Sequence, residues 1–176
     1  MAGKMMVPLL GIAAWSGTGK TTLLKQLIPW LRQNGIRSGI IKHTHHEMDV
    51  DKPGKDSYEL RHAGANQTLV ASEKRWALMT ETPERPPLDL HYLASRMDAS
   101  MLDLILVEGF KQEALPKIVL FREGAGHIAE DLELDEFVIA VATDVQLDSV
   151  CPLLDINDIE QIGLFIITWL KEQKGR

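Results

Sequence analysis

The feature that most constrains this chain is the segment 14–22, which reads Ala-Trp-Ser-Gly-Thr-Gly-Lys-Thr-Thr. A nearly continuous apolar run over 7–14 leads into it and predicts a strand buried on both faces. Apolar residues at helical spacing follow over 20–34 and predict a helix that ends at Gly35. A strand, a glycine-bearing loop with Gly-Lys-Thr and a helix form the pattern of a phosphate-binding P-loop, with Ala14 in place of the usual first glycine. The alternative is an ordinary strand-to-helix turn without a ligand.

The residue types in this loop suit a nucleotide triphosphate. Gly17 and Gly19 let the backbone present N–H groups to phosphate oxygens, and the helix adds the positive end of its dipole. Lys20 has the reach to contact the outer phosphates, and the Thr21 hydroxyl can ligate Mg²⁺. The predicted phosphate-binding residues are Gly17, Thr18, Gly19, Lys20, Thr21 and Thr22.

Length and composition limit the class of protein. A chain of 176 residues that is 45% hydrophobic predicts one domain over 1–176 with a substantial core. Its net charge of −6 argues against non-specific binding to nucleic acid or to an anionic membrane. With Cys151 as the one cysteine, no internal disulfide is expected, and the reducing cytoplasm is the expected compartment.

A second strand, predicted over 36–42, ends in a long polar segment over 42–56. Open α/β sheets bind ligands at this end of their strands. In one interpretation Lys42, His43 and Lys55 face phosphates, and Asp56 holds the metal or its water. In another, the three histidines of the segment bind a transition metal directly; these are His43, His45 and His46. In a third, the segment is a solvated loop with no specific role.

The segment 102–111 predicts a buried strand that ends in Glu108 and Gly109. An acid at the end of a strand beside the P-loop strand is where a magnesium-shell acid belongs, and Gly109 would allow a close approach to the γ-phosphate. Asp103, at the start of the strand, is interpreted as structural. Further strands are predicted over 117–122 and 137–142. Asp144 follows the second of these and is a candidate acceptor for a guanine base, although the usual motif around such an aspartate is absent.

The remaining elements complete an α/β pattern. Helices are predicted over 56–65, 88–97 and 159–170, the first capped by Asp56 or Ser57 and the last by Asn157-Asp158. Arg61 on the first helix either neutralises phosphate or pairs with nearby acids. Two short strands over 67–80 predict a hairpin or dimerisation segment. The fold class expected is a P-loop nucleotide-hydrolase fold: a mostly parallel, twisted sheet flanked by helices, with an added antiparallel region.

Five segments together resemble the molybdopterin-guanine dinucleotide biosynthesis adaptor protein B family, MobB, over essentially the whole chain. They are 14–22, Ile-Lys-His-Thr-His-His (41–46), Asp-Lys-Pro-Gly-Lys-Asp-Ser (51–57), Gly-Ala (64–65) and Leu-Val-Glu-Gly-Phe-Lys (106–111). The resemblance implies GTP and Mg²⁺ binding, weak GTP hydrolysis, homodimers formed through their sheets, and assistance to the guanylyltransferase that attaches GMP to molybdopterin. It also implies that Asp56 and Glu108 join Thr21 around the metal.

The leading hypothesis is therefore a GTP-binding adaptor with slow GTPase activity, acting with the guanylyltransferase and other proteins of the molybdenum cofactor pathway. The alternatives are a small-molecule kinase or ligase like dethiobiotin synthetase, and a histidine-rich metallochaperone GTPase. A homodimer is expected because the sheet has an edge to be covered.

Overall fold

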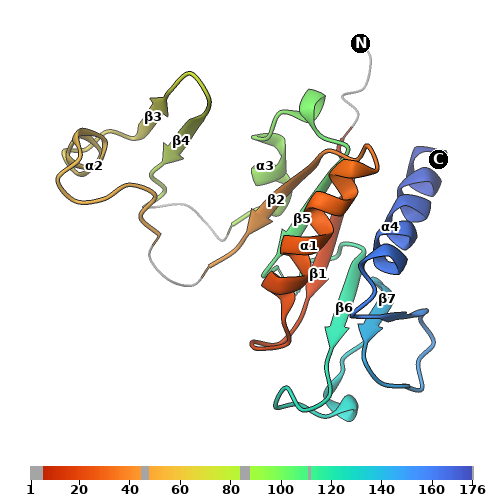
Figure 1. The fold of residues 1–176 in the computed structure, drawn as a ribbon. Helices are drawn as coiled ribbons and strands as arrows, with labels where there is room; N and C mark the ends of the chain where they lie inside the picture. Colours follow the sequence, from red (N-terminus) through yellow and green to blue (C-terminus); the bar gives the residue numbers. More distant parts are fainter. Residues whose placement is uncertain (1–5, 45–47, 84–87, 111, 176) are drawn as a thin grey trace. The chain divides into compact units, whose positions relative to one another are not determined.

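The computed structural model describes residues 6–44, 48–83, 88–110 and 112–175 of the chain. The chain divides into two compact units, the first comprising Met1–His43 with Leu90–Arg176 and the second Thr44–Asp89. The relative position of the two units is not determined, so each is described by itself (Figure 1). The hairpin expected over 67–80 lies in the second unit.

The first unit is built around a six-stranded sheet in the order β2-β5-β1-β6-β7-β8, in which every pairing is parallel. The strands are β1 (Leu9–Ala13), β2 (Ser38–Lys42), β5 (Leu104–Glu108), β6 (Lys117–Phe121), β7 (Val138–Thr143) and β8 (Leu153–Asp155). This confirms the parallel sheet and the position of the Glu108 strand beside the P-loop strand. The short strand β8 was not predicted, because three residues are too few to show an alternation of apolar and polar side chains.

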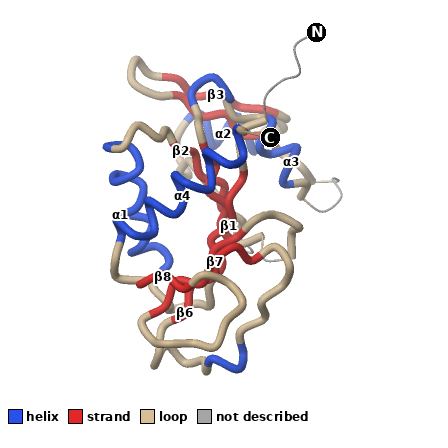
Figure 2. Tube along the Cα trace, turned by 90° about the vertical axis from the view of Figure 1, so that its right-hand side faces the viewer, coloured by secondary structure: helices blue, strands red, loops and turns tan. Residues whose placement is uncertain are grey.

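Two long helices cover one face of this sheet, α1 (Lys20–Gln33) and α4 (Ile159–Lys174). Figure 2 shows α1 and α4 together on one side of β1 and β7. Leu23, Leu24, Leu27 and Leu31 of α1 repeat at helical spacing and are buried with Leu10 and Ile12 of β1. The expected cap of α4 is confirmed, because the Asp158 side chain accepts a hydrogen bond from the Gln161 N–H at 2.9 Å.

The other face is covered by shorter elements. The helix α3 (Leu90–Ser95) buries Leu90 against Leu9, Ile105 and Val107. Two 3₁₀ turns, η1 (Ala99–Met101) and η2 (Ala129–Asp131), lie in the connections. The segment after β6 places Leu132 and Leu134 over Val119 and Val141. Both faces of the central strands are therefore buried, which explains their continuous apolar runs.

The second unit contains α2 (Asp56–His62) and the antiparallel hairpin of β3 (Gln67–Ala71) and β4 (Trp76–Thr80). The hairpin confirms the expected antiparallel addition. The expected cap of α2 is wrong, because Lys55 is the residue before the first turn and its side chain makes no capping hydrogen bond. Helices α2 and α3 are also shorter than the predicted ranges 56–65 and 88–97. Within the residues described, none of the helices combines the length and apolarity needed to span a bilayer.

Candidate nucleotide site

The loop between β1 and α1 has the backbone that phosphate binding requires. Gly17 and Gly19 have φ angles of +85° and +94°, in a region that side chains other than glycine rarely adopt. Gly19 is the residue before α1, and no side chain caps the helix there. The first N–H groups of a helix have no partner within it, so an uncapped start leaves them open to an anion. Thr18 is buried, with 1% of its surface exposed.

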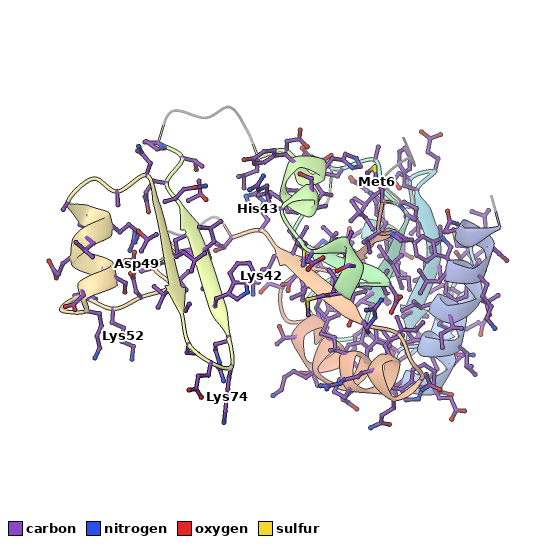
Figure 3. All side chains as sticks on the ribbon, turned by 90° about the horizontal axis from the view of Figure 1, so that it is seen from above. Met6, Lys42, His43, Asp49, Lys52 and Lys74 are labelled. Atoms are coloured by element: carbon purple, nitrogen blue, oxygen red, sulfur yellow. The ribbon has the colours of Figure 1, made fainter. Side chains whose placement is uncertain are left out.

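Glu108 brings two lysines together beside this loop. Lys20 Nζ lies 3.4 Å from Glu108 Oε1, and Lys42 Nζ lies 3.7 Å from the same atom. The sheet explains this meeting, because Glu108 is in register with Ile12 of β1 on one side and with Lys42 of β2 on the other. Figure 3 labels Lys42 and His43 where β2 ends. Three residues that the sequence assigned to the site are therefore adjacent in the first unit.

Gly109 has a structural reason to be glycine. Its φ is +95°, and a Cβ atom there would lie 2.9 Å from the carbonyl oxygen of His43. The His43 N–H donates to the Glu108 carbonyl at 2.8 Å, and the His43 and Phe110 rings lie 5.0 Å apart. The close approach at Gly109 is thus to the backbone of His43. Its approach to a γ-phosphate stays a prediction.

Asp144 lies at the end of β7, on the same edge of the sheet but two strands away from β1. Its carboxylate accepts hydrogen bonds from the Glu123 N–H at 2.9 Å and from Arg122 Nη1 at 3.4 Å. Arg122 Nη2 also donates to Asn157 Oδ1 at 3.0 Å. Asp144 and Asn157 line one hollow of about 350 Å³. The position suits a base-binding group, and the guanine contact stays a prediction.

Arg61, Lys55 and Asp56 belong to the second unit. Arg61 is 11% exposed, and its guanidinium contacts three carboxylates, at 2.6 Å to Asp49, 2.8 Å to Asp51 and 3.2 Å to Glu81. Burial alone would raise the pKa of the Asp51 carboxyl, but hydrogen bonds from Arg61 and Ser57 outweigh it and lower that pKa. These contacts favour the interpretation in which Arg61 pairs with nearby acids and fixes the start of its own unit.

A sequence model of the family described as "Molybdopterin guanine dinucleotide synthesis protein B" (MobB) matches residues 9–144. The chain belongs to the MobB family. It is 68% identical to the molybdopterin-guanine dinucleotide biosynthesis adapter protein of Escherichia coli (strain K12), over 99% of this chain and all of the relative. It is 52% identical to the protein of that name from Haemophilus influenzae, over 96% of this chain and 93% of the relative.

A solved MobB structure has the same fold. The crystal structure of a molybdopterin-guanine biosynthesis protein B covers 92% of this chain and 99% of its own, with a TM-score of 0.73 and 26% identity. A MobB homologue from Bacillus stearothermophilus gives a TM-score of 0.65 over 93% of this chain and 98% of its own, at 23% identity. The family and the fold class that the sequence predicted are both confirmed.

The oxygen ligands around the loop between β1 and α1 suit a hard cation. Thr21 supplies a hydroxyl and Glu108 a carboxylate, and Mg²⁺ prefers oxygen ligands. Asp56, the third predicted ligand, is an exposed residue at the start of α2 in the second unit, and its part in this set stays a prediction. Among the residues that the structure describes, no group of three or more His, Cys, Asp or Glu side chains is arranged to hold a metal. Of the histidine cluster, His45 and His46 lie outside the described residues.

Several groups near the loop between β1 and α1 were not predicted from the sequence. The indole of Trp15 stacks on the His127 ring, with centroids 4.2 Å apart and planes 11° apart. Lys117, at 5% exposure, forms an ion pair of 2.9 Å with Asp135. The sequence offered one signal for Lys117, because it is a charged residue at the start of an otherwise apolar strand. No local pattern pointed to the Trp15–His127 stack, because the two residues meet only through the packing of distant segments.

Proposed function

We propose that this chain is a GTP-binding adapter in the biosynthesis of molybdopterin guanine dinucleotide. The names of its relatives at 68% and 52% identity support the pathway. The observation that supports the nucleotide is the meeting of Lys20 and Glu108 at 3.4 Å beside a helix start that no side chain caps. In this proposal the triphosphate binds the loop, Mg²⁺ is the cofactor, and a guanylyltransferase of the pathway is the partner in the cytoplasm.

The charges of the site suggest how Mg²⁺–GTP would enter. Lys20 and Lys42 both form ion pairs with Glu108. When a triphosphate binds, its oxygens would replace Glu108 as the partner of Lys20, and Mg²⁺ would replace Lys20 as the partner of Glu108. The loop amides and the start of α1 would hold the remaining oxygens. Each group thus exchanges one counter-charge for another, so that no charge is left unpaired.

Hydrolysis in this proposal is slow. Fast GTPases add an arginine or a water-orienting group to the phosphate site. Arg122 is already bonded to Asp144 and Asn157, and Arg61 to Asp49, Asp51 and Glu81. Neither guanidinium is a free group for the γ-phosphate. We therefore assign the site to nucleotide-dependent delivery rather than to rapid turnover.

A homodimer is part of the proposal. In the hairpin, Leu69 faces Leu78 across the strands, and Ala71 faces Trp76, so these side chains share one face. Leu69, Trp76 and Leu78 are 59%, 66% and 41% exposed. An apolar face of this kind favours a partner surface, and a second copy of the chain supplies a matching one.

Two experiments test the proposal. Calorimetry measures GTP binding with Mg²⁺, which we expect for the natural chain and not for Lys20→Ala. Pull-down of the pathway guanylyltransferase, with and without GTP, tests the adapter role. Capture that needs neither GTP nor an intact Lys20 would contradict a nucleotide-dependent adapter.

A further inference from the structure

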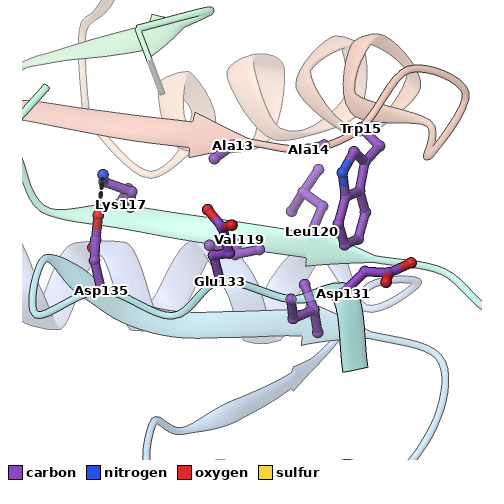
Figure 4. Close-up of a pocket in the computed structure, with 10 residues that line it drawn as sticks. Ala13, Ala14, Trp15, Lys117, Val119, Leu120, Asp131, Glu133 and Asp135 are labelled. Carbon is purple, nitrogen blue, oxygen red and sulfur yellow. Dashed lines mark hydrogen bonds and ion pairs between the residues drawn. The ribbon is translucent and has the colours of Figure 1, made fainter. Parts of the chain in front are cut away.

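The face of the sheet opposite α1 and α4 holds a pocket that the phosphate site does not use. It is a cavity of about 340 Å³, within the range of about 300–1,000 Å³ typical of small-molecule sites. Three segments of the first unit form it: the end of β1 with Ala14 and Trp15, the strand β6, and the segment 131–135 (Figure 4). Trp15 is also the second residue of the phosphate loop, so the pocket adjoins that loop.

The walls of the pocket suit a flat ring. Ala13, Val119, Leu120 and Leu132 provide apolar surface, and Trp15 provides an aromatic side wall. The indole is fixed from outside the pocket, because it stacks on His127 at 4.2 Å and meets Phe121 edge-on at 6.3 Å. A held aromatic ring can contact a planar ligand with little loss of side-chain entropy.

Of the four charged groups in the pocket, three already have partners. Lys117 Nζ donates to Asp135 at 2.9 Å, and this hydrogen bond lowers the pKa of the Asp135 carboxyl. The Asp131 carboxylate accepts from the Ile128 N–H at 3.3 Å and lies 3.9 Å from His127 Nδ1. In Figure 4 the Asp131 carboxylate points away from the centre of the pocket.

Glu133, an exposed residue of the segment 131–135, is the charged lining group left for a ligand. Its carboxylate lies in the middle of the pocket, between Lys117 and Trp15 (Figure 4). Within the described part of the chain, it has neither a hydrogen bond nor an ion pair. The lining carries three carboxylates and one ammonium, so the pocket disfavours phosphates and favours hydrogen-bond donors. A carboxylate accepts best from two adjacent N–H groups, one for each oxygen.

We infer that this pocket binds a planar heterocycle with an amide N–H next to an exocyclic amine, the edge that guanine and pterin share. The ring would lie against Trp15, and its two donors would face the Glu133 carboxylate. Adenine lacks this edge, because its amine sits beside a ring nitrogen that accepts, and that lone pair would face the carboxylate. The inference rests on the proposed function only in its choice of guanine and pterin, both of which are named in the relatives' product.

The test measures binding of 6-hydroxymethylpterin, guanosine and adenosine to the whole chain by calorimetry. Binding of the first, the second or both, without adenosine, is the expected result. Glu133→Gln keeps the shape but removes the charge, and it should weaken that binding about tenfold or more. Glu130→Gln, an exposed change nearby that does not line the pocket, should leave it unchanged.

The same variants distinguish the two possible ligands of the pocket, the guanine base of GTP and a separate pterin. If the pocket holds the base of loop-bound GTP, Glu133→Gln weakens GTP and spares inorganic tripolyphosphate with Mg²⁺. If it holds a separate pterin, GTP is unaffected. Lys20→Ala should lose tripolyphosphate and keep the heterocycle, so that a failure of the phosphate site and a failure of this pocket give different results.

Three results would overturn the inference. The first is no binding of either heterocycle at millimolar concentration. The second is equal binding by Glu133→Gln and Glu130→Gln. The third is methylguanidinium binding as tightly as the heterocycles with the same loss in Glu133→Gln, which would assign the pocket to an arginine side chain of a partner protein.

Discussion

Lys20 Nζ and Glu108 Oε1 lie 3.4 Å apart, although one residue opens α1 and the other closes β5. Both side chains are largely buried, with 18% and 13% exposure. Because the pair is shielded from water, each charge depends on the other until a ligand replaces it. This contact joins the loop between β1 and α1 to the acid predicted to hold Mg²⁺, and both residues can be tested by substitution.

Removing the Lys20 side chain should weaken nucleotide binding. Lys20→Ala takes away the charge that reaches the outer phosphates, so GTP affinity with Mg²⁺ should fall by at least about tenfold. Calorimetry at fixed Mg²⁺ measures the change. Lys25→Ala, on the exposed side of the same helix, is the control and should bind like the natural chain. Equal affinities for the two variants would refute the phosphate role of Lys20.

Neutralising Glu108 should weaken Mg²⁺ binding more than it weakens nucleotide binding. Glu108→Gln retains the shape of the side chain but offers Mg²⁺ a neutral oxygen, so the Mg²⁺ concentration for half-maximal GTP binding should rise about tenfold. Without Mg²⁺, GTP should bind no more weakly than to the natural chain, because the variant no longer competes for Lys20. The control is Glu113→Gln, which changes a carboxylate in the connection after β5. Magnesium titrations of Glu108→Gln that superimpose on those of this control would exclude Glu108 from the metal shell.

The Lys117–Asp135 pair should contribute to stability in a pH-dependent way. The hydrogen bond from Lys117 lowers the pKa of Asp135 below its ordinary value of 3.8. A carboxyl with a lowered folded pKa stabilises the protein above its unfolded pKa and loses that contribution as pH falls through the folded pKa. The contribution should therefore be complete at neutral pH and decline below about pH 4.

The same pair gives a comparison of two variants at pH 7. Asp135→Asn leaves the buried ammonium without this carboxylate and should destabilise the chain by about 1–3 kcal/mol. Lys117→Met removes the buried charge itself, and should be less damaging because its aliphatic chain fills the same space. Urea unfolding measures both. If Lys117→Met is the more destabilising of the two, the ion pair is not what makes Asp135 important.

The exposed face of the hairpin should control assembly. Trp76→Ser removes the largest of its apolar side chains, and light scattering at micromolar concentration should show a shift from dimer to monomer. Lys74→Ser, in the turn of the same hairpin (Figure 3), should remain dimeric. A natural chain that is already monomeric under these conditions would end the dimer proposal.

Local sequence patterns were sufficient to predict much of the fold. The continuous apolar runs around 7–14 and 102–107 form central strands, and the two short segments predicted as strands over 67–80 form a hairpin. These features are encoded in residues close together in the chain. Element ends were less accurate, as in α2 and α3, because the last turns depend on contacts with distant residues.

The sequence by itself determined the loop between β1 and α1, because Gly17 and Gly19, which take positive φ angles there, and Lys20, which begins the helix, are close neighbours in the chain. It also indicated Glu108, through its place at the end of an apolar strand. Only the tertiary structure decided which charges meet: Lys42 beside Glu108, Arg122 between Asp144 and Asn157, and Glu133 in a pocket next to Trp15. The physical reason is strand order, since β2-β5-β1-β6-β7-β8 makes neighbours of segments that are distant in the chain, and local periodicity carries no record of that order.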